Sequence, residues 1–130
     1  MQNKNILIVD DEKPVVTVIQ TALLKSPYIV HTASKVEAAF ELFVRVRPFL
    51  LLCDLKLENH VDGATLAGMI RREDPYVVNI CMTGSLSPFD KGYLLGGGAF
   101  SDIILKPFDI NLLRKIVADS SEKFNRWKAF

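Results

Sequence analysis

The sequence predicts an α/β fold, a single doubly wound domain in which five parallel strands alternate with helices in (βα)5 order. The first observation is that short apolar runs alternate with stretches of helical periodicity from one end of the chain to the other. The second is that three of these runs are apolar almost throughout, which is typical of strands buried on both faces. The third is a length of 130 residues with 49% hydrophobic residues, which suits one domain with a substantial core.

Five runs have the length of a strand. They are Asn5–Val9, Tyr28–Thr32, Phe49–Cys53, Val77–Met82 and Asp102–Leu105. Right-handed crossovers between parallel strands produce an open sheet, and such sheets bind ligands in the crevice beyond the carboxyl ends of their strands. Functional residues are therefore expected at that edge of the sheet.

Apolar residues at helical spacing predict the first two helices. Pro14 suits the first turn of the first helix, and Val36 to Val44 repeat the same spacing in the second. Ser34 and Glu37, three residues apart, predict a capping box at the start of the second helix. The apolar stripe of the first helix consists of Val15, Val18, Ile19, Ala22 and Leu23.

Three further helices are expected between and after the later strands. The third covers about residues 64–72 and stops before Pro75. The fourth, from about residue 88, is expected to be short because residues 96–98 are all glycine. Asp109 is the expected N-cap of the fifth helix. The inward residues of the fifth helix are expected to be Leu112, Leu113, Ile116 and Val117.

Charge and composition exclude several classes of partner. A formal net charge of +1 supplies no field that would attract nucleic acid or an anionic membrane. The N-terminal residues lack the features of a secretory signal, and no apolar stretch approaches the length of a membrane helix. Cys53 and Cys81 lie in apolar segments, which favours core thiols in a reducing compartment. A cytoplasmic protein is expected.

Charged and hydroxyl side chains follow the predicted strands. Asp10 and Asp11 follow the first strand, Asp54 the third, Thr83 the fourth and Lys106 the fifth. Carboxylates that converge at one edge repel each other, so the site must include a cation. A hard divalent ion such as Mg²⁺, or Mn²⁺, prefers these oxygen ligands. The lysine and the threonine hydroxyl suit the oxygens of a phosphoryl group, and a carboxylate can accept such a group as an acyl phosphate.

These residues resemble the receiver domains of two-component response regulators. The similarity runs from Ile6 to about Val117 and includes Asp62-Gly63 and Pro107-Phe108 in addition to the residues at the strand ends. It implies a flavodoxin-like sheet with strand order 2-1-3-4-5. It also implies a receiver domain over residues 1–120, with residues 121–130 as a C-terminal helix extension or tail.

The resemblance implies a role for each residue of the site. Asp54 would be the phosphoacceptor, and Asp10 and Asp11 would hold the metal together with Asp54 and the backbone carbonyl of Lys56. Thr83 would supply a hydroxyl to the new phosphate. Lys106, followed by a cis peptide bond, would be its counter-ion.

The resemblance also implies partners. A sensor histidine kinase or a histidine phosphotransfer protein would donate the phosphoryl group. A downstream effector would bind through the fourth helix, fifth strand and fifth helix. The chain would catalyse only its own phosphorylation and dephosphorylation, as a signalling protein and not an enzyme with turnover.

The sequence departs from the family pattern at several positions. Glu58 stands where receivers usually have proline, and the loop to Asp62 is one residue longer. Ile103 occupies the position of the switch aromatic, three residues before the lysine, and Phe100 is the aromatic that could replace it. Lys56 and Ser85, two residues after the aspartate and the threonine, are expected to tune the lifetime of the phosphoryl group.

Two other functions compete with phosphorylation-dependent switching. Ile103 favours a receiver-like interaction module that does not switch through phosphate. A small Mg²⁺-dependent phosphohydrolase would use the same aspartyl chemistry, but Lys56 stands where such enzymes usually place a second carboxylate. Phe124 and Trp127 continue the stripe of the fifth helix, which fits a helix end packed on the domain, a homodimer contact or a linker.

Overall fold

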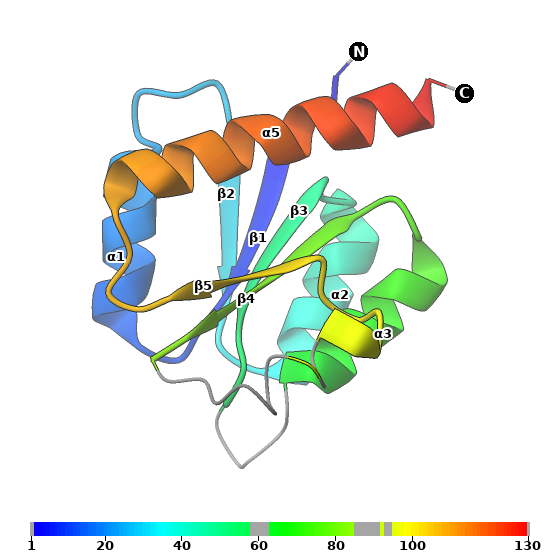
Figure 1. Ribbon diagram of the computed structural model, residues 1–130, viewed down its shortest axis with the longest axis horizontal. Coiled ribbons are helices and arrows are strands. Elements are labelled where there is room, and N and C mark those ends of the chain that lie inside the picture. Colours follow the sequence, from blue (N-terminus) through cyan, green and yellow to red (C-terminus); the bar gives the residue numbers. More distant parts are fainter. Residues whose placement is uncertain (1, 58–62, 85–91, 93–94, 130) are drawn as a thin grey trace.

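The computed structural model describes residues 2–57, 63–84, 92 and 95–129. Its five parallel strands form one sheet with the order β2-β1-β3-β4-β5, as predicted (Figure 1). The strands are β1 (Asn5–Val9), β2 (Ile29–Ala33), β3 (Leu50–Asp54), β4 (Val78–Thr83) and β5 (Asp102–Leu105).

The observed strands lie close to the predicted ones. The bounds of β1 and β5 are those predicted, whereas β2, β3 and β4 begin and end one residue later. Phe49 and Val77 are buried but lie just before the first paired residues of β3 and β4. At the other end of these strands, Asp54 and Thr83 are still paired with residues of the neighbouring strands. Two candidate site residues are therefore held by the sheet itself and do not belong to loops.

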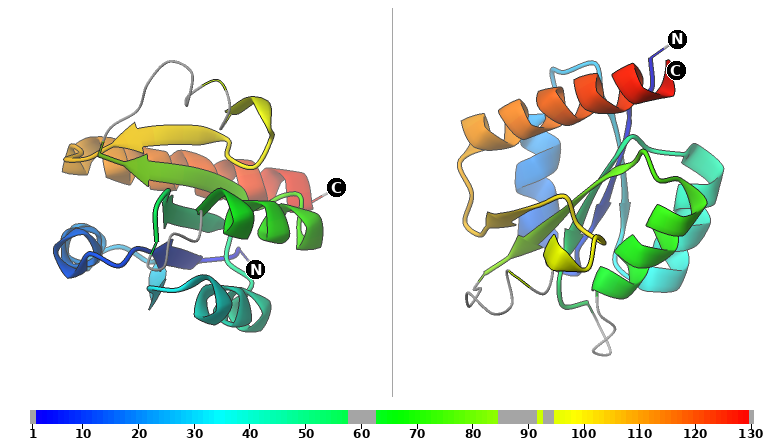
Figure 2. Two further views of the ribbon diagram at one scale, coloured as in Figure 1. Left: turned by 90° about the horizontal axis from the view of Figure 1, so that it is seen from below. Right: turned by 45° about the vertical axis from the view of Figure 1, so that its right-hand side comes forward.

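Helices cover both faces of the sheet. They are α1 (Lys13–Ala22), α2 (Val36–Val46), α3 (Gly63–Glu73) and α5 (Ile110–Lys128). Helices α1 and α5 contact each other on one face, and α2 and α3 contact each other on the other (Figures 1 and 2). This arrangement is the doubly wound, flavodoxin-like fold. The predicted fourth helix falls mostly outside the described residues.

One prediction about a helix end and three about helix faces are wrong. Val18 of α1 and Val44 of α2, predicted in the apolar stripes of their helices, are exposed by 42% and 45%, because Val16 and Leu42 pack against the core instead. Ser34 does not cap α2: the N-cap is Lys35, which makes no side-chain cap hydrogen bond, because β2 extends to Ala33 and the helix begins one residue later. Leu112 does not point inward: 47% of it is exposed, because the buried stripe of α5 runs through Leu113, Val117 and Phe124. The N-cap of α5 is confirmed, since the Asp109 carboxylate accepts hydrogen bonds from the backbone N–H groups of Asn111 and Leu112.

The central strands form the core. Residues 6–9 of β1 and 50–53 of β3 are completely buried, and Cys53 and Cys81 are core residues as predicted. Helix α5 continues without a break through the predicted tail as far as Lys128. Phe124 packs on Phe49 with ring centroids 6.4 Å apart. In the part of the chain that the structure describes, no helix is long and apolar enough to cross a membrane.

Candidate functional site

Acidic side chains meet where β1 and β3 end. Val9 and Cys53 are partners across these adjacent strands, so the residues that follow them, Asp10 and Asp54, emerge side by side. Carboxylate oxygens of Asp10, Asp11, Glu12 and Asp54 all lie within 4.8 Å of one another. At that separation each pair of ionised carboxylates repels by about 3 kcal/mol at an effective dielectric constant near 20.

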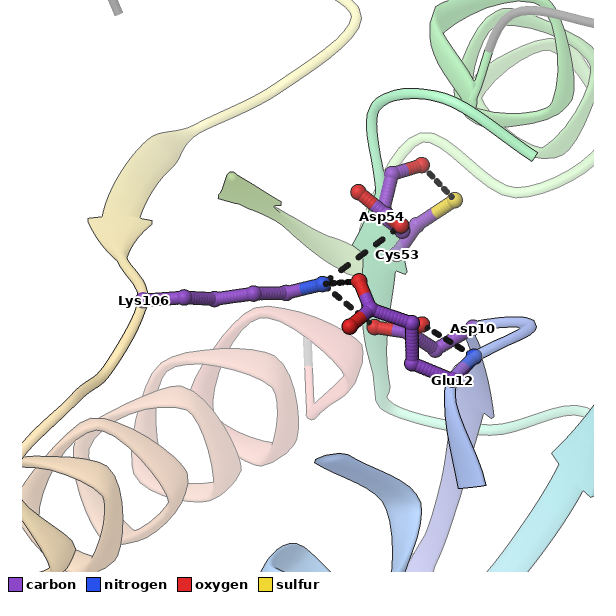
Figure 3. Close-up of polar contacts among 5 residues, drawn as sticks. All are labelled: Asp10, Glu12, Cys53, Asp54 and Lys106. Atoms are coloured by element: carbon purple, nitrogen blue, oxygen red, sulfur yellow. Dashed lines mark hydrogen bonds and ion pairs between the residues drawn. The ribbon is translucent and has the colours of Figure 1, made fainter. Parts of the chain in front are cut away.

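Lys106 reaches this cluster from the other side of the crevice. Its backbone N–H donates to the Thr83 carbonyl at 2.7 Å, which extends the pairing of β5 with β4. Its Nζ lies 2.8 Å from Asp10 Oδ2, 3.3 Å from Glu12 Oε1 and 3.4 Å from Asp54 Oδ2 (Figure 3). The predicted cis peptide bond between Lys106 and Pro107 is present. One ammonium group therefore contacts three carboxylates.

Burial and neighbouring charges act in opposite directions on the pKa of Lys106. Burial alone would lower its pKa, but the hydrogen bond to Asp10 and the charges of Asp10 and Asp54 outweigh burial and raise the pKa above the ordinary value of 10.5. The side chain is thus a fixed positive charge at neutral pH. It is placed where an incoming anion would need one.

Asp54 is a carboxylate whose charge is disfavoured. Its pKa is raised above the ordinary value of 3.8, first by burial and second by the negative charge of Asp10. Lys106 and the backbone N–H of Lys56 act against this shift because they stabilise the ionised form. The carboxylate therefore gains stability from any additional cation beside it.

Asp10 and Asp11 differ in accessibility. The side chain of Asp10 is fully buried, with Oδ1 accepting from the Glu12 N–H at 2.9 Å and Oδ2 accepting from Lys106. Asp11 is exposed. The cluster thus holds four carboxylates, three of which contact Lys106, and their excess negative charge and hard oxygen atoms fit Mg²⁺. Asp10, Asp11, Asp54 and the carbonyl of Lys56 are the residues that could hold it.

The crevice beside this cluster is open to solvent and has a volume of 760 Å³. Thr83 lies on its wall at the end of β4, next to Gly84. A phosphoryl group would enter between an acidic wall and the lysine. The lining residues are Asp11, Glu12, Val15, Asp54, Leu55, Lys56, Thr83, Gly84, Lys106 and Pro107.

The two residues considered for the switch lie near the amino end of β5, one inside the strand and one before it. Ile103 is half-buried, packs against the core and pairs with Cys81. Phe100 is buried and precedes the amino end of β5. It lies five residues before Leu105, which is the strand partner of Thr83. At ~3.3 Å per residue this places Phe100 ~16 Å from the level of Thr83, too far to contact it. Ser85 and Glu58 lie outside the described residues.

Two contacts of the site were not predicted. Glu12 was recognised only as part of an acidic run, and its ion pair with Lys106 joins residues 94 positions apart in the sequence. Gly63 was recognised only as part of the Asp62-Gly63 pair that resembles the family, although its amide donates to the Leu55 carbonyl at 2.7 Å beside Asp54. Neither contact has a local sequence signal, because both depend on how distant segments pack.

Comparison with known proteins agrees with this geometry. Residues 6–118 match the family model described as the response regulator receiver domain. The chain is 34% identical over 123 residues to the alkaline phosphatase synthesis transcriptional regulatory protein PhoP of Bacillus subtilis (strain 168), covering 92% of this chain and 50% of that protein. It is 32% identical over 112 residues to the regulatory protein AtoC of Escherichia coli (strain K12), covering 86% of this chain and 24% of that protein. The chain thus spans half or less of the length of these relatives.

Solved structures share the fold. The signal receiver domain of an HD domain-containing protein from Pseudomonas fluorescens Pf-5 superposes with a TM-score of 0.90 at 22% identity, covering 99% of this chain and 94% of that one. The beryllofluoride-activated NtrC4 receiver domain dimer gives a TM-score of 0.83 at 22% identity, covering 93% and 98%.

Proposed function

The chain belongs to the response regulator receiver domain family, and on this basis we propose that it accepts a phosphoryl group on Asp54 in the cytoplasm. The donor would be a sensor histidine kinase or a histidine phosphotransfer protein, with Mg²⁺ required. The observation that supports this best is the position of Asp54 Oδ2. It lies 3.4 Å from Lys106 Nζ and beside Asp10 and Asp11, the two carboxylates that follow β1.

The reaction is a transfer from nitrogen to oxygen. An oxygen of the Asp54 carboxylate attacks the phosphorus of a phosphohistidine, an O–P bond forms and the P–N bond breaks. The imidazole leaves with the electron pair of that bond and takes a proton from water. Mg²⁺ or Mn²⁺, held by Asp10, Asp11, Asp54 and the carbonyl of Lys56, would supply positive charge to the phosphoryl oxygens.

The chain's own residues position and neutralise the transferred group. Lys106 is already within ion-pair distance of Asp54, so it can contact a phosphoryl oxygen with little movement. Thr83 lies on the wall of the same crevice, where its hydroxyl can donate to another oxygen. Lys56 stands two residues after Asp54, so no second carboxylate follows it as an acid or base for turnover. We therefore propose a signalling protein that catalyses only its own phosphorylation and dephosphorylation.

The effector surface is proposed at β5, α5 and the predicted fourth helix. The Lys106 N–H contacts the Thr83 carbonyl, so a change at Asp54 can reach β5 through Lys106. Three apolar side chains of β5 and α5 are exposed: Leu105 by 56%, Ile110 by 41% and Leu112 by 47%. Exposed apolar groups suit contact with a partner, either an effector or a second copy of the chain.

A second candidate function is an interaction module that does not respond to phosphate. Ile103 favours it, because no aromatic ring at this position can rotate between an exposed and a buried state. Hydrogen exchange with and without beryllofluoride and Mg²⁺ separates the two functions. A switch predicts altered exchange of β5 and α5 amides, whereas a module without switching predicts changes confined to the residues around Asp54.

Intact-mass measurement tests the proposed chemistry. After incubation with acetyl phosphate and Mg²⁺, the parent chain is expected to gain one phosphoryl group, and the Asp54→Asn variant or a sample with chelated metal is expected to gain none. Equal labelling of the parent and the variant would overturn the assignment of Asp54.

A further inference from the structure

Gly63, the first residue of α3, packs directly on the backbone of Asp54. A Cβ atom placed on Gly63 would lie 2.1 Å from the Asp54 carbonyl oxygen, 3.1 Å from its carbonyl carbon and 3.0 Å from Cys53 Sγ. Atoms that are not bonded do not approach to 2.1 Å. Only a residue without a side chain fits at this position while both segments stay where they are.

The backbone on either side of this contact is also fixed. The Gly63 N–H donates to the Leu55 carbonyl at 2.7 Å, and the Leu55 N–H donates to the Met82 carbonyl at 3.3 Å. The Cys53 thiol donates to the Asp54 carbonyl at 3.2 Å (Figure 3). The peptide group after Asp54 is therefore held between β4 and the first turn of α3.

We infer that Gly63 is a positioning residue for phosphorylation. Because Gly63 has no side chain, α3 can begin against the Asp54 carbonyl. This contact fixes the position of the Asp54 carboxylate relative to Lys106, Asp10 and Asp11. The inference rests on the proposed function, because it assigns a role in the reaction of Asp54. It concerns a residue outside the groups that would contact the phosphate or the metal.

A methyl group at Gly63 would move Asp54 and could not simply displace the helix. The atom it meets is part of the backbone, which cannot rotate away as a side chain can. Helix α3 cannot retreat easily, because Leu66, Ala67 and Ile70 on its inner face are completely buried. A shift of roughly an ångström at a reacting group can slow a reaction about a hundredfold.

The same helix supplies a matched control. Gly68 has no described atom within 4 Å of the position of an added Cβ. Neither Gly63 nor Gly68 is among the residues with positive φ. The substitutions Gly63→Ala and Gly68→Ala therefore make the same chemical change in one helix, without backbone strain, and differ in what the new methyl group meets.

The experiment compares first-order rate constants of variants that are folded. Uptake from acetyl phosphate at saturating Mg²⁺ and loss of the phosphoryl group are followed by intact mass, at a temperature where circular dichroism shows each variant folded. Gly63→Ala is expected to slow uptake at least tenfold, and Gly68→Ala to stay within twofold of the parent. Val117→Ala, which shortens a fully buried side chain of α5, controls for lost stability and is also expected to stay within twofold.

The outcomes separate this inference from the proposed function. If the parent chain takes up no phosphoryl group, the proposed function fails. If the parent is labelled and Gly63→Ala reacts as fast as Gly68→Ala, the positioning role is wrong.

A measurement on the parent chain covers the case in which Gly63→Ala does not fold. In a ¹⁵N-labelled sample, beryllofluoride with Mg²⁺ is expected to shift the amide resonance of Gly63 and leave that of Gly68 in place. An unchanged Gly63 resonance, in a sample whose Asp54 resonance does move, would contradict the positioning role.

Discussion

At the scale of single residues, the site holds Asp54 in a state that binding of a cation would relieve. Burial and the charge of Asp10 disfavour the ionised carboxylate, and only part of this cost is offset by Lys106 and the Lys56 amide. Buried charges that are incompletely paired cost stability. The ionised Asp54 carboxylate is therefore expected to destabilise the metal-free fold.

Replacing Asp54 tests this cost. Because its pKa is raised in the folded chain, the folded state binds a proton more tightly than the unfolded state, and the ionised carboxylate lowers stability at neutral pH. Asp54→Asn is expected to raise the free energy of unfolding at pH 7 without Mg²⁺. The advantage of the variant should shrink as the pH falls through the raised pKa and vanish below the ordinary value of 3.8. Urea unfolding across this pH range measures the difference, and a variant less stable than its parent at pH 7 would contradict the account.

At the scale of helices and strands, buried patterns were predictable and boundaries less so. The predicted runs located all five strands to within one residue, and the signal was strongest for β1, β3 and β4, because strands covered on both faces must be apolar. The prediction that Ser34 caps α2 was wrong because the start of this helix depends on where β2 ends. The end of β2 is set by its pairing with β1. Leu112 failed because its spacing alone did not show which side of the stripe faces the sheet.

The N-cap of α5 gives a prediction at this scale. The Asp109 carboxylate accepts from the Asn111 N–H at 2.6 Å and from the Leu112 N–H at 3.3 Å. Asp109→Ala is expected to lower the free energy of unfolding by about 1 kcal/mol. The control Asp119→Ala removes an exposed carboxylate of the same helix that pairs with the exposed Lys115, and is expected to change stability by less than about 0.5 kcal/mol. Equal effects of the two substitutions in urea unfolding would show that the cap contributes nothing.

At the scale of the whole molecule, the strand order assembles the site. Residues 10, 54, 83 and 106 lie at the end of four strands or directly after it, and the parallel sheet places the ends of those strands along one edge. The sequence alone was sufficient to predict this convergence, because it depends only on topology. It was not sufficient to predict the contacts of Lys106 with Glu12 or of Gly63 with Asp54, because those depend on distances between packed segments.

Coupling between metal binding and folding follows from this assembly. An ion that binds only the assembled site stabilises the fold, by about 2.7 kcal/mol when its concentration is a hundred times the dissociation constant. Mg²⁺ is therefore expected to raise the melting temperature of the parent chain in a concentration-dependent way. Asp11→Asn should abolish most of this effect without harming the fold, because Asp11 is exposed. An equal response of the variant to Mg²⁺ would exclude Asp11 as a ligand.

Chemical trapping of the acyl phosphate tests whether Asp54 is the phosphoacceptor. The chain is incubated with acetyl phosphate and Mg²⁺, reduced with borohydride, digested and analysed by tandem mass spectrometry. Reduction of an aspartyl phosphate converts that residue into homoserine. The account predicts homoserine at position 54 and at no other aspartate; homoserine at Asp10 or Asp11 with position 54 unchanged would contradict it.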